Sequence, residues 1–274
     1  MSEFVLSCTT CATRAPGKEE ISECFIHAPA AGYKAWGIAG PLLWTRGLVR
    51  WVNAGLLRRS ALEVGLQACT EVYGPAFPTD SVEVARQAAG DIALLFPFAE
   101  QIGSPLVVIS GGKRQSGGLE ATIAGIEALL PTIEDSPVRL ALEPHYRSQI
   151  QDREDYDTIL HEITSPQVGI TLDTGHFHSA GVDWKALIDR YADRVYNVHV
   201  KDHVGTQSVA LGRGEVNLRG YIEALHAIDY RGALAVELEV VDHENLPRYC
   251  AEAYTLLDEL VRQVTGSPPS IPPV

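Results

Sequence analysis

Four apolar segments in the second half of the chain each end in a side chain that can bind a metal ion. They are RLALEPH, GITLDTGH, YNVHVKDH and ALAVELE, and the residues at their ends are Glu143, Asp173, His199 and Glu237. A charge at the end of a buried strand is costly unless it has a partner. The intervals between the four positions are 30, 26 and 38 residues, which is room for a strand and a helix each. Four such ends in succession predict one shared partner, and a divalent cation is the simplest.

Apolar runs alternate with amphipathic segments along the whole chain, which gives eight β/α pairs. The expected strands cover residues 4–8, 33–39, 62–72, 106–110, 138–143, 168–173, 195–200 and 234–240, and the expected helices cover 19–31, 48–57, 82–102, 119–130, 153–163, 184–191, 218–228 and 246–264. Strands that are apolar throughout indicate a parallel sheet covered on both faces. Eight pairs that close on themselves predict a single (β/α)8 TIM barrel. An open doubly wound sheet is the competing arrangement, but no GxGxxG motif follows the first expected strand.

The bulk properties predict one α/β domain over residues 1–264, because no linker interrupts the alternation. Residues 265–274, TGSPPSIPPV, are rich in Pro and Ser and are expected to form a flexible C-terminal tail. The net charge of −13 opposes binding to a phosphate backbone, so we expect no nucleic-acid partner. No apolar run approaches the ~20 residues that span a bilayer, and the N-terminus lacks the basic region of a signal peptide. We therefore expect a cytoplasmic protein with no membrane partner.

In a β/α barrel the carboxyl ends of the strands meet at one face, where catalytic groups lie. The four candidate ligands end the fifth to eighth expected strands, and neighbouring strands are only ~5 Å apart. Four consecutive ends therefore form an arc that one ion can bridge. Three carboxylates and one imidazole suit Mn²⁺, Mg²⁺, Co²⁺ or Fe²⁺ better than Zn²⁺, which prefers more nitrogen and sulfur ligands. Four unrelated loop charges are the alternative, and their common register makes it the weaker one.

The motifs around these strand ends resemble those of the xylose-isomerase-like barrel superfamily. The matching pieces are Leu-Glu143-Pro-His, Leu-Asp173-Thr-Gly-His176, Val-His199-Val-Lys-Asp202, Gly212-Arg-Gly214-Glu and Val-Glu237-Leu-Glu. This superfamily holds sugar isomerases and epimerases, inosose dehydratases and relatives of endonuclease IV. The resemblance implies that Glu143, Asp173, His199 and Glu237 hold the metal. It further implies that Glu143 and Glu237 act as the acid/base pair, and that His176 hydrogen-bonds the substrate oxygens.

The chain also departs from particular branches of this superfamily. Ketose 3-epimerases carry a second Glu and an Arg where this chain has Gln149 and Gly205. Endonuclease IV relatives need histidines after the third and fourth strands, and residues 62–74 and 106–112 contain none. A close ketose 3-epimerase and a DNA-repair nuclease are therefore both disfavoured.

Further candidate residues lie near the expected strand ends. Lys201 shares the side of His199 by strand alternation, so it can reach substrate oxygens. Arg213 stands between two glycines on a loop, where a substrate contact and ordinary turn chemistry fit equally well. Glu71 and Tyr73, at the third strand end, can wall a sugar pocket or belong to the core.

The five cysteines are expected to be free thiols, because their number is odd and no export signal precedes them. Cys8 and Cys11 have the CxxC spacing, but no second pair completes a zinc site. The simpler interpretation is that Cys8 and Cys11 are two cysteines at the end of a buried strand.

Together these residues predict a divalent-metal-dependent isomerase or epimerase acting on a sugar or polyol-derived ketone. Moving a proton beside a carbonyl needs a base and an acid, with an enediolate between, and a metal stabilises that oxyanion. The same groups also suit a lyase of the inosose dehydratase type. A non-catalytic, metal-stabilised sugar-binding barrel is a third hypothesis. The substrate, the metal and the formation of a homo-oligomer stay open at this point.

Overall fold

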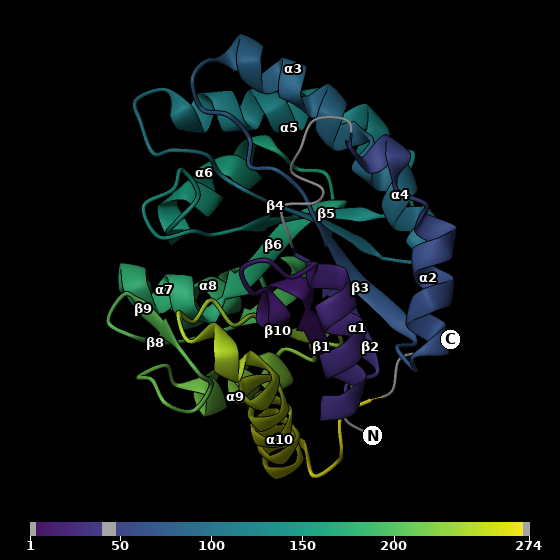
Figure 1. Ribbon diagram of the computed structural model, residues 1–274. Coiled ribbons are helices and arrows are strands. Elements are labelled where there is room, and N and C mark those ends of the chain that lie inside the picture. Colours follow the sequence, from purple (N-terminus) through teal and green to yellow (C-terminus); the bar gives the residue numbers. More distant parts are fainter. Residues whose placement is uncertain (1–3, 40–47, 271–274) are drawn as a thin grey trace.

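Eight parallel strands close into a barrel, and helices surround it in the computed structural model (Figure 1). The structure describes residues 4–39 and 48–270. The barrel strands are β1 (Val5–Thr9), β2 (Ala35–Ile38), β3 (Ala68–Tyr73), β4 (Leu106–Ser110), β5 (Arg139–Glu143), β6 (Val168–Asp173), β7 (Val195–Val200) and β10 (Ala233–Val236). They neighbour one another in chain order, and β10 pairs with β1 to close the ring. The predicted (β/α)8 barrel is confirmed.

Helices connect the strands on the outside of the barrel. They are α1 (Glu20–Ala31), α2 (Ala54–Glu63), α3 (Val82–Ala93), α4 (Leu95–Ile102), α5 (Gly118–Glu134), α6 (Arg153–Glu162), α7 (Thr174–Ala180), α8 (Trp184–Arg190), α9 (Leu218–Ala227) and α10 (Leu246–Thr265), with short 3₁₀ helices η1 (Thr10–Thr13), η3 (Leu48–Trp51), η4 (Ala192–Arg194) and η5 (His243–Asn245). In Figure 1, α3 and α5 lie along one side of the strands, and α9 and α10 lie on the opposite side.

The structure corrects four of the expected elements. The helix expected over 48–57 is the 3₁₀ helix η3 followed by a separate helix, α2, that continues six residues further. The single helix expected over 82–102 is two helices that meet at Leu94, and Pro97 lies in the first turn of α4, where a missing N–H breaks no helical bond. The third strand begins at Ala68 rather than at residue 62, because α2 continues through Glu63 and Gly65 then turns the chain with a φ of 92°. The eighth strand ends at Val236, four residues earlier than expected.

Two short elements at the carboxyl end of the barrel are absent from the sequence-based assignment. Helix α7 follows β6 directly, and a hairpin of β8 (Asp202–Val204) and β9 (Gln207–Val209) follows β7. Both are shorter than the windows in which periodicity can be recognised. They matter because they carry residues next to the candidate site.

Strand alternation decides which side chains point into the barrel. On β5, Leu140 and Leu142 pack in the large core between sheet and helices, whereas Ala141 packs in a second cluster. That cluster also contains Val108 from the neighbouring strand β4 and Tyr196 from β7, the next strand but one. Because side chains two positions apart share a face, the residues with the parity of Ala141 point into the barrel, Glu143 included.

The two ends of the described chain meet at the first strand. The backbone N–H of Ser270 donates to the carbonyl of Phe4 at 2.8 Å, and Ser270 forms a parallel bridge with Val5. Residues 271–274 of the expected tail, and residues 1–3 and 40–47 of the expected domain, lie outside the described residues. The boundaries 1–264 and 265–274 therefore stay predictions. No helix among the described residues is long and apolar enough to cross a membrane.

Candidate metal centre

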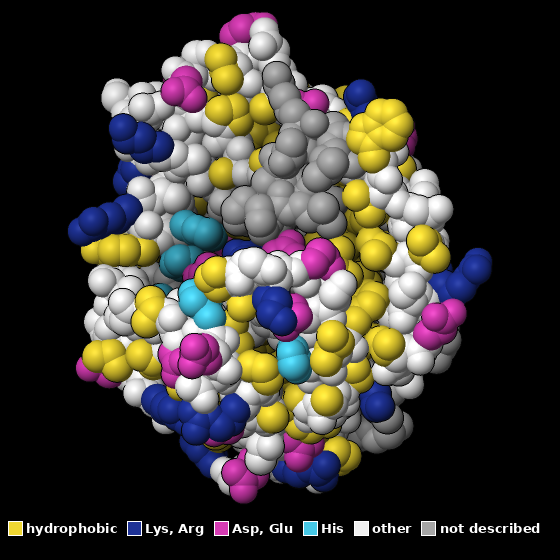
Figure 2. All heavy atoms as spheres, in the orientation of Figure 1, with side chains coloured by type: hydrophobic (Ala, Val, Ile, Leu, Met, Phe, Trp, Pro, Cys, Tyr) yellow, Lys and Arg dark blue, Asp and Glu magenta, His cyan; other side chains and the backbone are white. Residues whose placement is uncertain are grey.

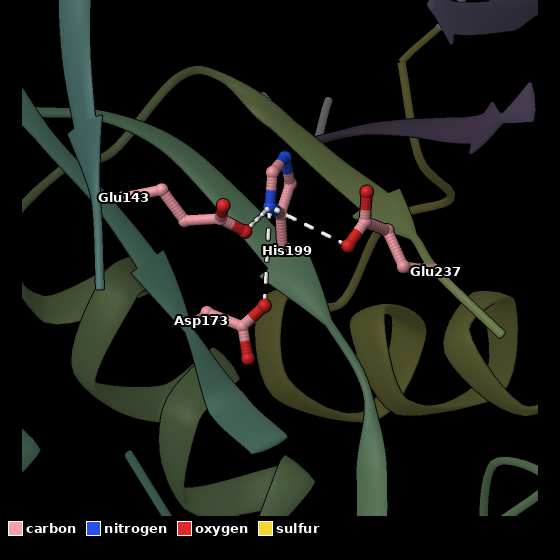
Figure 3. Close-up of side chains that lie close together, drawn as sticks. All are labelled: Glu143, Asp173, His199 and Glu237. Atoms are coloured by element: carbon pink, nitrogen blue, oxygen red, sulfur yellow. Dashed lines mark hydrogen bonds and ion pairs between the residues drawn. The ribbon is translucent and has the colours of Figure 1, made fainter. Parts of the chain in front are cut away.

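Four side chains converge at the carboxyl end of the barrel, one from each of four neighbouring strands (Figure 3). Glu143 and Asp173 are the last residues of β5 and β6, His199 is next to last in β7, and Glu237 directly follows β10. The register pairs Asp173 with His199 across β6 and β7. All four residues are buried, and one ligand atom from each lies within 4.8 Å of the others. The arc expected from the sequence is therefore present.

The dimensions and the chemistry of this cluster fit a divalent ion. His199 Nδ1 lies 2.5 Å from Glu143 Oε1, 3.7 Å from Glu237 Oε2 and 3.9 Å from Asp173 Oδ2. Two ligands of one ion with bonds of ~2.1 Å are ~3–4 Å apart. The separations of 3.7 and 3.9 Å fit that range, whereas the 2.5 Å contact between His199 Nδ1 and Glu143 Oε1 is a hydrogen bond that an ion would have to open. Asp173 Oδ2 is buried and accepts no hydrogen bond from a neutral group within the described residues; its partner there is the ammonium of Lys201, 3.1 Å away, so this oxygen already faces a positive charge.

A buried glutamate holds the other side of the His199 ring. Nε2 of His199 lies 2.9 Å from Oε2 and 3.1 Å from Oε1 of Glu71, which is fully buried on β3. Burial acts to lower the pKa of His199, but the carboxylates of Glu237, Glu71 and Glu143 outweigh it and raise the pKa well above its ordinary value. Among the described residues Glu71 does not line the pocket, and its carboxylate contacts His199 and Asn197. It lies behind the cluster.

The second oxygen of Glu143 is held by two further side chains. The Tyr73 hydroxyl donates to Glu143 Oε2 at 2.5 Å, and His145 Nε2 lies 2.6 Å from the same atom. Burial acts to raise the pKa of Glu143, but the neighbouring His145 and His199 outweigh it and hold the pKa well below its usual value. Glu143 is thus an oriented carboxylate with partners on both oxygens.

Lys201 is a buried cation beside the cluster. Its Nζ lies 2.8 Å from Glu237 Oε2, 3.1 Å from Asp173 Oδ2 and 3.1 Å from Glu239 Oε2. Burial acts to lower the pKa of Lys201, but these carboxylates raise it well above its ordinary value. Burial raises the pKa of Glu237 to about 7, because the charges of His199 and Lys201 offset only part of the desolvation. Lys201 therefore adjoins the side of the cluster that Glu237 occupies.

His176 lies next to Lys201 because Asp173 starts helix α7. The Asp173 side chain accepts a hydrogen bond of 2.7 Å from the His176 backbone N–H, as an N-cap does. The ring of His176 then stacks on His145, with centroids 4.2 Å apart, and its Nε2 lies 3.4 Å from Lys201 Nζ. Burial lowers the pKa of His176 well below its ordinary value, so its ring is neutral near pH 7. The DTGH motif thus places a metal-ligand candidate and a substrate-contact candidate together.

A pocket opens beside this cluster, and among the described residues Asp173, His199 and His176 are not part of its lining. Its lining comes from the ends of several strands and consists of Cys11, Arg14, Ala39, Tyr73, Glu143, His145, Lys201, Glu237 and Glu239. In Figure 2 histidine side chains gather near the centre of one face, with acidic side chains beside them. Arg14 and Cys11 were not singled out as site residues by their sequence context. They come from the segment after β1, where no charged strand end marks a site.

Arg213 is not brought together with the other candidates. Its guanidinium pairs with Glu252 at 2.7 Å and lies over the ring of Tyr249, 4.9 Å from the centroid. In the described part of the chain, Arg213 is not one of the residues that line the pocket. The glycines on either side of Arg213 hold the loop in place, because the Asp202 carboxylate accepts hydrogen bonds from the N–H groups of Gly212 and Gly214.

The two departures from ketose 3-epimerases have structural roles here. Gln149 is buried, and its Oε1 accepts a hydrogen bond of 3.1 Å from the backbone N–H of Gln115, which ties the loops after β4 and β5 together. Gly205 has a φ of 56° and lies between the two strands of the β8–β9 hairpin. Neither residue lines the pocket in the described part of the chain.

The cysteines are free, as expected, and all five are buried. Cys8 Sγ lies 3.5 Å from Cys250 Sγ in the core, whereas Cys11 lines the pocket. The CxxC spacing therefore does not bring Cys8 and Cys11 into a common site.

Residues 30–260 match the family model of the xylose isomerase-like TIM barrel, so the chain belongs to this family. The resemblance noted in its motifs is thereby confirmed.

Among curated proteins, the chain is similar to the rhizopine catabolism protein MocC of Rhizobium meliloti, with 30% identity over 147 residues. That match covers 42% of this chain and 45% of MocC. An inosose dehydratase of Lactiplantibacillus plantarum is 26% identical over 121 residues, which are 37% of this chain and 40% of the relative. The chain thus spans less than half the length of these two relatives in the matched regions.

Among solved structures, an L-ribulose 3-epimerase superposes with a TM-score of 0.77 and 15% identity, over 96% of each chain. The IOLI protein, whose structure contains a zinc atom, superposes with a TM-score of 0.74 and 17% identity, over 95% of this chain and 99% of its own. At these identities the two structures show a shared fold.

Proposed function

We propose that this chain is a divalent-metal-dependent enzyme that isomerises or epimerises a sugar or polyol-derived ketone by proton transfer. One observation carries the proposal. The four strands stand in the order β5, β6, β7, β10, so Glu143 and Glu237 occupy the two ends of the arc. Two carboxylates on different sides of one reaction centre suit a reaction in which one group removes a proton and another returns it.

Glu143, Asp173, His199 and Glu237 would hold the ion. When bound there, a divalent ion supplies Lewis-acid stabilisation of the oxyanion that forms when a proton leaves the carbon beside a carbonyl. The oxygen-rich ligand set favours Mn²⁺, Mg²⁺, Co²⁺ or Fe²⁺. The zinc atom in the IOLI structure makes Zn²⁺ a necessary member of any metal panel.

The other side chains around the cluster would orient the base and bind the substrate. Glu143 is oriented by Tyr73 and His145, so its carboxylate is in place before substrate arrives. The ammonium of Lys201 and the neutral ring of His176 lie together and would donate to or accept from substrate hydroxyl oxygens. Removing a proton from one face of a carbon and returning it to the other face inverts that carbon. Returning the proton to the neighbouring carbon instead converts a ketose to an aldose.

A lyase of the inosose dehydratase type is the second candidate. Matched segments of inosose dehydratases and the roles of Gln149 and Gly205 favour it over a close ketose 3-epimerase. The same base would act beside the ketone, and a β-hydroxyl group would then leave. A non-catalytic sugar-binding barrel is a third candidate. Such a protein has no need of the oriented glutamate Glu143.

The test is turnover in D₂O by metal-loaded protein with a panel of ketoses and inososes, followed by mass spectrometry and NMR. Solvent deuterium in a rearranged product without loss of water identifies an isomerase or epimerase. Loss of one water identifies the lyase. Deuterium exchange into no compound of the panel, with metal bound, favours the sugar-binding barrel.

The matched variants are Glu143→Gln and Glu237→Gln, with the exposed Glu252→Gln as the control. Each of the first two should lower kcat by about 10²–10⁴-fold, the usual worth of a general acid or base, while the fold is kept. The control should have the kcat of the parent. Full activity in Glu143→Gln or Glu237→Gln would contradict the proposed mechanism.

A further inference from the structure

Glu71 is a fully buried carboxylate that belongs neither to the four-residue cluster nor to the lining of the pocket, among the described residues. It lies on β3, across the barrel from β7, and is 128 positions away from His199 in the chain. An ionisable side chain inside a barrel is costly without specific partners. Its contacts therefore indicate what it does.

Both oxygens of Glu71 face the same ring nitrogen. Nε2 of His199 lies 2.9 Å from one oxygen and 3.1 Å from the other. The side-chain amide of Asn197, also on β7, donates a hydrogen bond to Oε2 of Glu71. The carboxylate is thus held between β3 and β7 and directed at the back of the His199 ring.

A glycine on the neighbouring strand leaves the space that Glu71 occupies. A Cβ atom at Gly37, on β2, would lie 2.7 Å from Cγ of Glu71 and 3.3 Å from its Cδ. Both separations are shorter than ordinary carbon–carbon contacts. Any larger residue at position 37 would push the Glu71 side chain away from its present path.

The contact with Glu71 decides which nitrogen of the His199 imidazole carries the proton. A histidine binds a metal through one nitrogen when the other carries the proton and donates it to an acceptor. In His199, Nδ1 faces the cluster and Nε2 faces Glu71. The amide nitrogen of Asn197 only donates, so the acceptor for Nε2–H is the Glu71 carboxylate.

We propose that Glu71 is a positioning residue of the metal centre, which fixes the ring orientation and tautomer of His199 and so sets the affinity for a divalent ion. The inference rests on the metal role of the cluster in the proposed function. It goes beyond that role in assigning part of the binding strength to a side chain that touches neither metal nor substrate.

The experiment is calorimetric titration of metal-free protein with Mn²⁺, alongside thermal unfolding of the metal-free form. Glu71→Gln keeps the shape and removes the charge, and Gly37→Ala displaces the side chain without changing it. Each should weaken Mn²⁺ binding by about 10–100-fold, the usual effect of losing such a partner. Asp155→Asn, a buried carboxylate paired with Arg114 outside the pocket, is the matched control and should keep the parent affinity.

Two results would overturn the inference. Parent-like Mn²⁺ affinity in folded Glu71→Gln is one, and parent-like affinity in Gly37→Ala is the deciding result if Glu71→Gln does not fold. A parent protein that binds no divalent ion would instead remove the proposed function itself. Because affinity is measured on folded, metal-free protein, a merely structural role of Glu71 would change the Tm and leave the affinity unchanged.

Discussion

Lys201 Nζ lies 2.8 Å from Glu237 Oε2 inside the end of the barrel, so a cation of the chain itself already adjoins a candidate metal ligand. Lys201 is only 1% exposed and also contacts Asp173 Oδ2 at 3.1 Å. A divalent ion in the cluster would share these two carboxylates with the ammonium group. Lys201 therefore balances charge in the metal-free protein as well as facing the pocket.

Lys201→Met should strongly destabilise the metal-free protein. Removing one partner of a buried ion pair leaves its carboxylates uncompensated, which costs about 3–5 kcal/mol. Mn²⁺ should then raise the Tm of the variant more than that of the parent, because the ion replaces the missing positive charge. Thermal unfolding with and without Mn²⁺ measures both effects.

The control for this variant is Lys185→Met. Lys185 and Asp189 form an exposed pair at 3.0 Å on α8, and such pairs contribute under about 1 kcal/mol. An equal and small loss of stability in the two variants would show that the contacts of Lys201 carry no special weight.

Removal of divalent ions should lower the Tm and abolish turnover, and Mn²⁺ should restore both. An ion that binds only the folded state stabilises it by about 2.7 kcal/mol when present at 100 times its Kd. Differential scanning calorimetry after chelation and after stepwise addition of metal measures the shift. Asp173→Asn should lose most of this metal-dependent shift in Tm, since it removes the negative charge of one of the four candidate ligands. A Tm independent of divalent ions would count against the metal centre.

Gly175→Ala should destabilise the protein by about 1–3 kcal/mol, the usual effect of overpacking. A Cβ atom at Gly175 would lie 2.6 Å from His203 Nε2 and 2.8 Å from Lys201 Cβ, so α7 would have to move away from these two side chains. Gly90→Ala is the matched control within α3, where a Cβ meets nothing within 4 Å. It should stabilise by about 0.5–1 kcal/mol because alanine favours a helix. Denaturant unfolding of both variants gives the comparison.

The buried thiols should react slowly with alkylating reagents in the native protein. Burial raises the pKa of Cys69 to about 12, and burial together with the nearby Glu237 and Glu239 raises that of Cys11 well above its usual value. Thiolate is the reactive form, so the labelling rate should keep rising with pH above 9. All five thiols should react at once after unfolding. A native rate that levels off near pH 8.5, as for a free cysteine, would contradict this expectation.

The sequence by itself determined the barrel and the strand ends. Residues 168–173 and 195–200 are strands with the predicted bounds, because an apolar run closed by a ligand-type residue is a local pattern. Strand alternation and the common face of parallel strand ends then place Glu143, Asp173, His199 and Glu237 in one arc. These rules need only the order of residues along the chain, and the family model likewise matches the sequence, over residues 30–260.

Only the tertiary structure decided which other side chains join that arc. Glu71 reaches His199 across the closed barrel, and Lys201 contacts one carboxylate at the end of β6 and two in the segment after β10. Arg213, in an equally suggestive local context, pairs with Glu252 on α10 instead. Such contacts depend on how strands 128 residues apart are brought together and on which gaps, such as that at Gly37, the packing leaves. No pattern of neighbouring residues encodes those distances, because they arise when the barrel closes.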